Sequence, residues 1–107
     1  MRIDAFNHFY PAPYYKKMEE VGGDLKDMFR RARAVPSIHN LDVRFKIMDA
    51  FDAYAQILSL PAPTLETISK GDPKRALELA KIANDGLAEH VAKYPQRFPA
   101  FIAQTPL

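Results

Sequence analysis

The 107-residue sequence contains no cysteine and only four glycines. Without cysteine the chain has no disulfide, no thiol nucleophile and no thiolate metal site, which is compatible with a reducing compartment. It also lacks an apolar stretch long enough to cross a bilayer. Its first residues do not show the basic and then apolar pattern of a secretion signal. We therefore expect a cytoplasmic protein with no membrane partner.

A dominant sign of charge is missing as well. The chain has 15 basic and 13 acidic residues, a net charge of +2, and the signs alternate without a long basic block. This balance argues against a nucleic-acid partner. The densest basic stretch, from Arg30 to Arg33, is interpreted as a solvated helix face. The alternative is that it binds a phosphate or carboxylate group. An apolar fraction of 48% and a charged fraction of 26% are typical of globular proteins, and the length fits one small domain.

The opening segment carries the most information. Residues 2–8 predict a buried strand, in which alternation places Asp4, Phe6 and His8 on one face and Asn7 on the other. This face would combine an acid, a bulky apolar group and an imidazole. Such a combination is typical of the inside of a barrel with an active site at one end. As a buried acid, Asp4 is expected to make a structural hydrogen bond.

Apolar periodicity and prolines predict the remaining elements. The expected strands cover 2–8, 54–60 and 98–104, and the main helices cover 41–52 and 73–93. The order of strands and helices gives two βαβ units, hence an α/β fold with a parallel sheet.

Several residues indicate where helices begin. Asp72 is a natural N-cap for the last helix, with Pro73 at its first position. Asn40 is expected to cap the helix over 41–52, and Asp24 a short helix that ends at Arg33. A further short helix is expected from Pro13 to Val21, stopped by Gly22 and Gly23.

A sheet of three parallel strands would be incomplete. It would have two open edges and, with right-handed crossovers, one uncovered face. Parallel strands are normally buried on both faces. We therefore expect a homo-oligomer, or association of this segment with the rest of a barrel.

Five sequence blocks carry a resemblance to a known family. They are Ile3-Asp4-x-x-x-His8-Phe9-x-Pro11, Leu41-Asp42-Val43-Arg44-x-x-x-Met48-Asp49, Gln56-Ile57-Leu58-Ser59-Leu60-Pro61, Ala83-Asn84-Asp85-Gly86-Leu87-Ala88 and Tyr94-Pro95-x-Arg97-Phe98-x-x-Phe101. In this order they resemble the N-terminal third of the amidohydrolase-related family, typified by aminocarboxymuconate semialdehyde decarboxylase and the resorcylate decarboxylases.

The resemblance implies that residues 1–107 are the incomplete N-terminal segment of one TIM-type (β/α)8 barrel domain. It further implies a metal-dependent enzyme acting on a small carboxylated substrate. The usual activity in the family is nonoxidative decarboxylation, and some members are hydrolases or hydratases.

The resemblance also implies a role for His8. The first strand of the family usually ends His-x-His, and both imidazoles bind a divalent metal, commonly zinc. Here Phe6 replaces the first histidine, and Asn7 points to the opposite face. One histidine is not a metal site, because catalytic zinc needs about three protein ligands. His8 is thus a candidate metal ligand in the complete barrel, or a substrate-contacting base, or a core histidine. The rival interpretation is a barrel relative that has lost its metal and binds a ligand without turnover.

Three further residues are candidate substrate contacts: Tyr10, His39 and Arg44. Tyr10 enters the first loop, where family members often line the pocket, and aromatic packing is the alternative. His39 precedes a helix and is expected over the barrel mouth. Arg44 is a candidate for a substrate carboxylate, or for an ion pair with Asp49 or Asp52.

Two residues near the end of the chain are expected to be structural. Asn84 lies at the edge of an apolar stripe and is expected to satisfy a backbone group. His90 is interpreted as a solvent-facing bystander.

Overall fold

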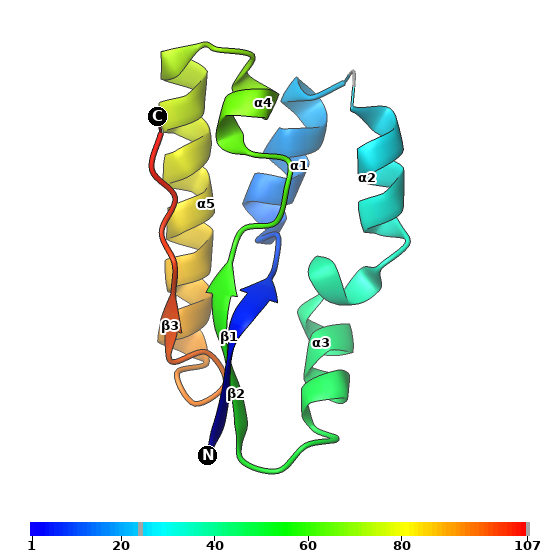
Figure 1. The fold of residues 1–107 in the computed structure, drawn as a ribbon, viewed down its shortest axis with the longest axis vertical. Coiled ribbons are helices and arrows are strands. Elements are labelled where there is room, and N and C mark those ends of the chain that lie inside the picture. The colour runs from blue at the N-terminus through cyan, green and yellow to red at the C-terminus, as the bar shows by residue number, and fades with distance from the viewer. Residues whose placement is uncertain (24, 107) are drawn as a thin grey trace.

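A computed structural model describes residues 1–23 and 25–106. Figure 1 shows a small sheet with α5 behind it and α3 to one side, while α1, α2 and α4 lie beyond the ends of the strand arrows. The elements, in chain order, are β1 (Arg2–His8), α1 (Ala12–Val21), α2 (Lys26–Arg33), the 3-10 turn η1 (Pro36–Ile38), α3 (Leu41–Met48), β2 (Tyr54–Ser59), α4 (Leu65–Ser69), α5 (Pro73–Lys93) and β3 (Ala100–Phe101).

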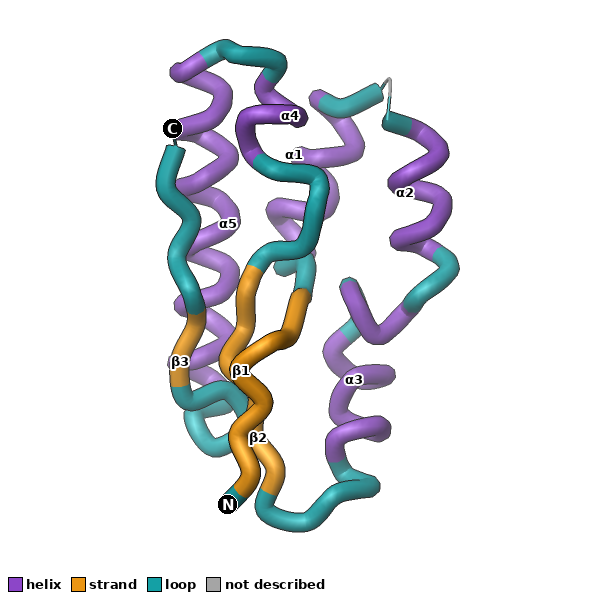
Figure 2. Tube along the Cα trace, viewed as in Figure 1, coloured by secondary structure: helices purple, strands orange, loops and turns teal. Residues whose placement is uncertain are grey.

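The sheet confirms the predicted α/β fold. Its order is β1-β2-β3 and both pairings are parallel, which is consistent with the start of a TIM-type barrel. Figure 2 shows the strands of this sheet side by side, connected through helices. None of the helices in the described residues is long and apolar enough to cross a membrane.

The third strand is much shorter than the predicted 98–104. Only Ala100 and Phe101 pair with β2. Before them, Phe98 is fully buried in the core. After them, the Asn84 side chain hydrogen-bonds both backbone groups of Gln104. It donates to the carbonyl at 2.9 Å and accepts from the N–H at 2.7 Å. The chain therefore leaves the sheet for α5, and the predicted role of Asn84 is confirmed.

Helix α3 ends at Met48 instead of residue 52. Beyond it the backbone tightens into hydrogen bonds to the third preceding residue, from Ala50 to Ile47 and from Phe51 to Met48. Ala53 then adopts a positive φ of 50° in the turn before β2. The apolar periodicity predicted the helix correctly but could not show this tighter ending.

The predicted helix starts are confirmed where they can be compared. Asp72 accepts from Lys74 N at 3.0 Å, and Asn40 accepts from Val43 N at 3.2 Å. Asp24 lies outside the described residues. Arg30 and Arg33 are exposed and pair with Asp27 and Glu19, which confirms the solvated helix face.

The buried apolar side chains of the described residues form two clusters. One lies between the sheet and the helices α3 and α5, and it contains Phe9, Met48, Leu58, Leu87 and Phe98. The other joins α1, α2, α4 and the first half of α5, with Tyr10, Tyr14, Met18, Phe29, Leu65, Ile68 and Leu79 among its members. Gly86 allows α5 to approach closely, because a Cβ there would lie 2.4 Å from Pro11 Cβ.

A bulge in β1 corrects the predicted strand face. Asp4 pairs with Gln56 and Asn7 pairs with Leu58, so β1 has one more residue between these pairs than β2 has. An extra residue inverts the alternation that follows it. Asp4 consequently lies on the face of Gln56, toward α3, whereas His8 pairs with Ser59 on the opposite face. The prediction that Asp4 shares a face with His8 was wrong.

Candidate functional site

His8 is the last residue of β1 and lies beside the last residue of β2. Its Nδ1 is 2.9 Å from Ser59 Oγ, which in turn donates to the Asn7 carbonyl at 2.6 Å. The imidazole is therefore held at the carboxyl end of the parallel strands, the edge at which TIM-barrel enzymes carry their chemistry.

Phe6 occupies the open face next to His8. The two rings meet edge to face with their centroids 4.9 Å apart, and Phe6 is 82% exposed. An exposed apolar ring thus stands where the family resemblance implies a first histidine. Within the described part of the chain, no three His, Asp or Glu side chains come together in a group that could hold a metal. These residues by themselves therefore do not fit a metal ion.

Arg44 is buried against the strand ends. Its Nε donates to Ser37 O at 2.9 Å, its Nη1 to Gln56 Oε1 at 2.8 Å, and its Nη2 to the carbonyl of His8. The guanidinium also lies 5.1 Å from the centroid of the Phe9 ring. Burial lowers the pKa of Arg44 from its ordinary value. Arg44 thus joins α3 to the backbone of His8.

Neither predicted ion pair of Arg44 is found among the described residues. Asp49 instead pairs with Arg97 at 2.5 Å. The periodicity that placed Arg44 on a buried helix was correct, but a buried guanidinium can be satisfied by carbonyl oxygens as well as by carboxylates.

Asp4 makes the structural hydrogen bonds expected of it. Its Oδ1 accepts from Phe6 N at 3.0 Å, and its Oδ2 accepts from Tyr54 OH at 3.1 Å. These bonds stabilise the ionised form, so the pKa of Asp4 is lowered, chiefly by the Phe6 N–H. Asp4 therefore stabilises the bulge.

Tyr10 lies in the core. Its hydroxyl donates to the carbonyl of Ala62, and its ring stacks on Tyr14 with the centroids 6.3 Å apart. Burial raises the pKa of Tyr10 to about 12. Of the two interpretations of Tyr10, the contacts favour aromatic packing.

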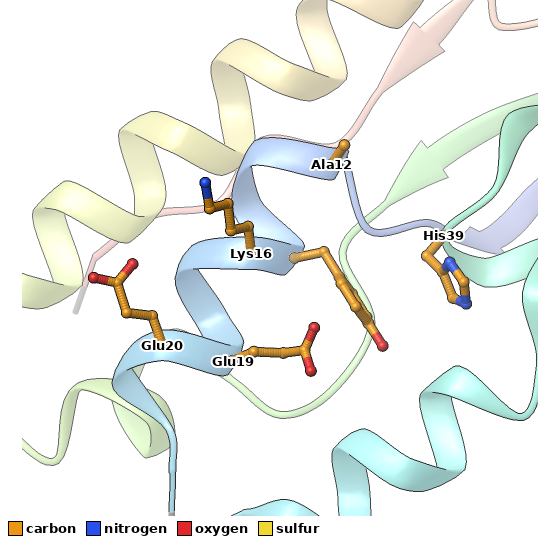
Figure 3. A pocket seen from close by; sticks show the side chains of 6 residues that line it. Ala12, Lys16, Glu19, Glu20 and His39 are labelled. Atoms are coloured by element: carbon orange, nitrogen blue, oxygen red, sulfur yellow. The ribbon is translucent and has the colours of Figure 1, made fainter.

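His39 lines a cavity of about 630 Å³. Figure 3 shows His39 facing the helix that carries Ala12, Lys16 and Glu19. The His39 ring stacks on Tyr15 with the centroids 5.0 Å apart. Both His39 Nε2 and Tyr15 OH are buried without a hydrogen-bond partner in the part of the chain that is described.

The cavity lies near the carboxyl end of β1, because Tyr10 N donates to Ile38 O at 2.8 Å directly before His39. Sequence analysis missed Tyr15. The spacing of Ala12, Tyr15 and Glu19 puts these residues on one helix face and is the signal that could have indicated the cavity wall.

His90 does not face solvent, so that prediction was wrong. Its ring meets Phe9 edge to face with the centroids 5.5 Å apart, and both ring nitrogens are buried without a partner among residues 1–23 and 25–106. Burial lowers the pKa of His90. The end of α5 covers the cluster around Phe9. The position of His90 at the side of an apolar stripe did not predict that its ring would be buried there.

No family model matches the sequence. Curated relatives do. The chain is 38% identical over 95 residues, 89% of its length, to the gamma-resorcylate decarboxylase of Rhizobium radiobacter. It is 47% identical over 62 residues, 58% of its length, to the gamma-resorcylate decarboxylase of Rhodococcus jostii.

The alignments cover 24% and 18% of those two relatives. The chain therefore spans about a quarter or less of the length of the proteins it matches. The identity and the parallel α/β fold confirm the predicted resemblance to the resorcylate decarboxylases.

Proposed function

We propose that the protein carrying this segment is a nonoxidative decarboxylase of a small hydroxybenzoate-like acid. The observation that carries the proposal is 38% identity over 89% of the chain to a gamma-resorcylate decarboxylase. In such a reaction the bond between the ring carbon and the carboxylate breaks, carbon dioxide leaves, and the ring carbon takes up a proton. No oxidant or reductant is needed.

We assign His8 the role of the substrate-contacting imidazole. It lies at the carboxyl end of β1, its Nδ1 is occupied by Ser59, and its Nε2 makes no hydrogen bond within the described residues. Nε2 is thus available to a hydroxyl or carboxyl group of a ligand. A positioned imidazole is the usual proton-transfer group in enzymes.

We assign the cavity at His39 the role of a second substrate contact. Tyr15 and His39 line the cavity, and Tyr15 OH and His39 Nε2 are buried polar atoms without partners in the described chain, which a carboxylic acid entering between the two rings would satisfy. Arg44 and Tyr10 are not assigned as contacts, because their polar atoms already bind protein carbonyls or Gln56.

A divalent metal, usually zinc in the family, would need ligands from outside residues 1–107. From this segment His8 is the only candidate ligand proposed.

The rival function is ligand binding without turnover, and Phe6 favours it. A phenyl ring has no lone pair, yet it stands on the face of His8 at the family's metal-binding position.

The test is carbon dioxide release from 2,6-dihydroxybenzoate by the intact protein. We expect His8→Ala to lower kcat by about 10²-fold or more. Ile3→Ala, a change in the same strand at a half-exposed side chain, should leave kcat unchanged. Binding of hydroxybenzoates without carbon dioxide release would support the rival, and release of a carboxylic acid from an ester or amide would indicate a hydrolase.

A second experiment tests the metal. Because Phe6 and His8 lie on one face, Phe6→His should raise the zinc content of the intact protein, measured by elemental analysis. His8→Ala should lower it. Equal zinc in wild type and both variants would show that β1 contributes no ligand.

A further inference from the structure

We infer that Ser59 is a positioning residue that fixes His8 in one tautomer, with the proton on Nδ1 and the lone pair on Nε2. The inference rests on the proposed function in one respect: it says which nitrogen of His8 meets the ligand. The tautomer itself is a property of the folded chain.

The assignment follows from counting hydrogens. A serine hydroxyl has one hydrogen, and a carbonyl oxygen can only accept. Ser59 Oγ lies 2.6 Å from the Asn7 carbonyl, so its hydrogen is used there. Toward His8 Nδ1, at 2.9 Å, the same oxygen can then only accept. Nδ1 must be the donor, and in the neutral ring the lone pair is on Nε2.

The backbone makes this arrangement rigid. His8 and Ser59 are register partners at the ends of β1 and β2, and Phe9 N donates to Ser59 O at 2.9 Å. The carbonyl of His8 is bound by Arg44. Both polar groups of the peptide unit after His8 are therefore bound, and the Asn7 carbonyl before it accepts from Ser59 Oγ.

The free nitrogen faces the open side of the sheet. Phe6 lies against the ring on that side, and Nε2 is not among the fully buried atoms without a partner. An imidazole that presents a lone pair accepts a hydrogen from a hydroxyl or an un-ionised carboxyl group. In metal sites, loss of the hydrogen-bond partner that fixes the tautomer of a ligating histidine lowers metal affinity or activity by about 10–100-fold.

The tautomer can be measured by long-range ¹H–¹⁵N correlation in the intact protein, without ligand or metal, at pH 8.5. We expect a single Nδ1–H form for His8 in wild type and in Ser59→Thr, which keeps the hydroxyl. In Ser59→Ala the Nδ1–H population should fall to about half or less. His39 and His90, which do not contact Ser59 in the described structure, are internal references whose signals should not change.

An Nε2–H form of His8 in wild type would overturn the inference, even if Ser59→Ala fails to fold. An Nδ1–H form unchanged in folded Ser59→Ala would also overturn it. The measurement involves no substrate. If the tautomer is as expected and no carbon dioxide is released, the proposed function fails and the positioning role of Ser59 stands.

Discussion

The two faces of the β1–β2 sheet differ in what covers them. On one face Leu58 and Gln56 are buried beneath α3 and α5. On the other, Phe6 is 82% exposed and Ile3 is 52% exposed, and His8 lies between the strand ends. The difference separates two tasks: the covered face stabilises the fold, and the open face presents the imidazole.

The largest difference in stability is expected between Leu58→Ala and Phe6→Ala. Leu58 is fully buried in the cluster with Phe9 and Leu87, so its truncation should lower the free energy of unfolding by about 2–5 kcal/mol. Truncation of the exposed Phe6 should change it by less than about 0.5 kcal/mol. Urea denaturation measures both, and equal losses would show that both faces are covered in solution.

A smaller difference is expected between Arg44→Met and a control at Arg97. The substitution leaves the carbonyls of His8 and Ser37 and the side chain of Gln56 without their donors. An unpaired buried polar group costs about 1–3 kcal/mol, and relaxation will reduce the sum, so we expect a loss of roughly 3 kcal/mol. The control is Arg97→Met, which removes a half-exposed ion pair and should cost less than about 1 kcal/mol. Similar losses would contradict a buried anchoring role.

The open face should also affect association. Its exposed apolar side chains include Phe6, Ile3 and Ile102, and exposed apolar patches of this kind mark contact surfaces. If residues 1–107 are expressed alone, we expect concentration-dependent association in sedimentation velocity. Phe6→Lys should weaken it by about tenfold or more, corresponding to ~1.4 kcal/mol. A monomer at all concentrations would contradict the prediction.

The smallest effect is expected from His90. Burial lowers its pKa in the folded chain below the ordinary value of 6.5. As pH falls below 6.5 the unfolded chain binds a proton first, so the free energy of unfolding declines. Glu89 and Lys93 lie on the same helix. The charge of Glu89 raises the pKa of His90 and that of Lys93 lowers it, so the two effects partly cancel. His90→Phe should make this decline shallower between pH 7 and pH 5. An unchanged pH profile would show that His90 is not buried in solution.

Much of this arrangement could be predicted from local sequence. The starts of α3 and α5 follow from Asn40 and Asp72, whose side chains bond the first backbone N–H groups of each helix. Parallel pairing follows from the alternation of strands and helices. The helix starts depend on interactions within a few residues, and the order of strands and helices follows from local periodicity.

The features that were missed depend on distant partners. The bulge between Asp4 and Asn7 is supported by local bonds from Phe6 N and Asn7 Nδ2 to Asp4, and also by Tyr54 OH, 50 residues away, which local periodicity cannot reveal. The shortening of β3 depends on Asn84 and Gln104. Likewise, the buried position of His90 depends on Phe9. Periodicity cannot reveal contacts of this kind.

The free energy of unfolding of His8→Gln tests the central claim most directly, namely that His8 is a functional residue on an open face. The substitution removes one part-buried hydrogen bond to Ser59, and such a bond contributes about 1 kcal/mol. The predicted result is a loss of no more than about 1 kcal/mol in the intact protein. A loss of about 3 kcal/mol or more, similar to that of Leu58→Ala, would make His8 a core residue and contradict the account.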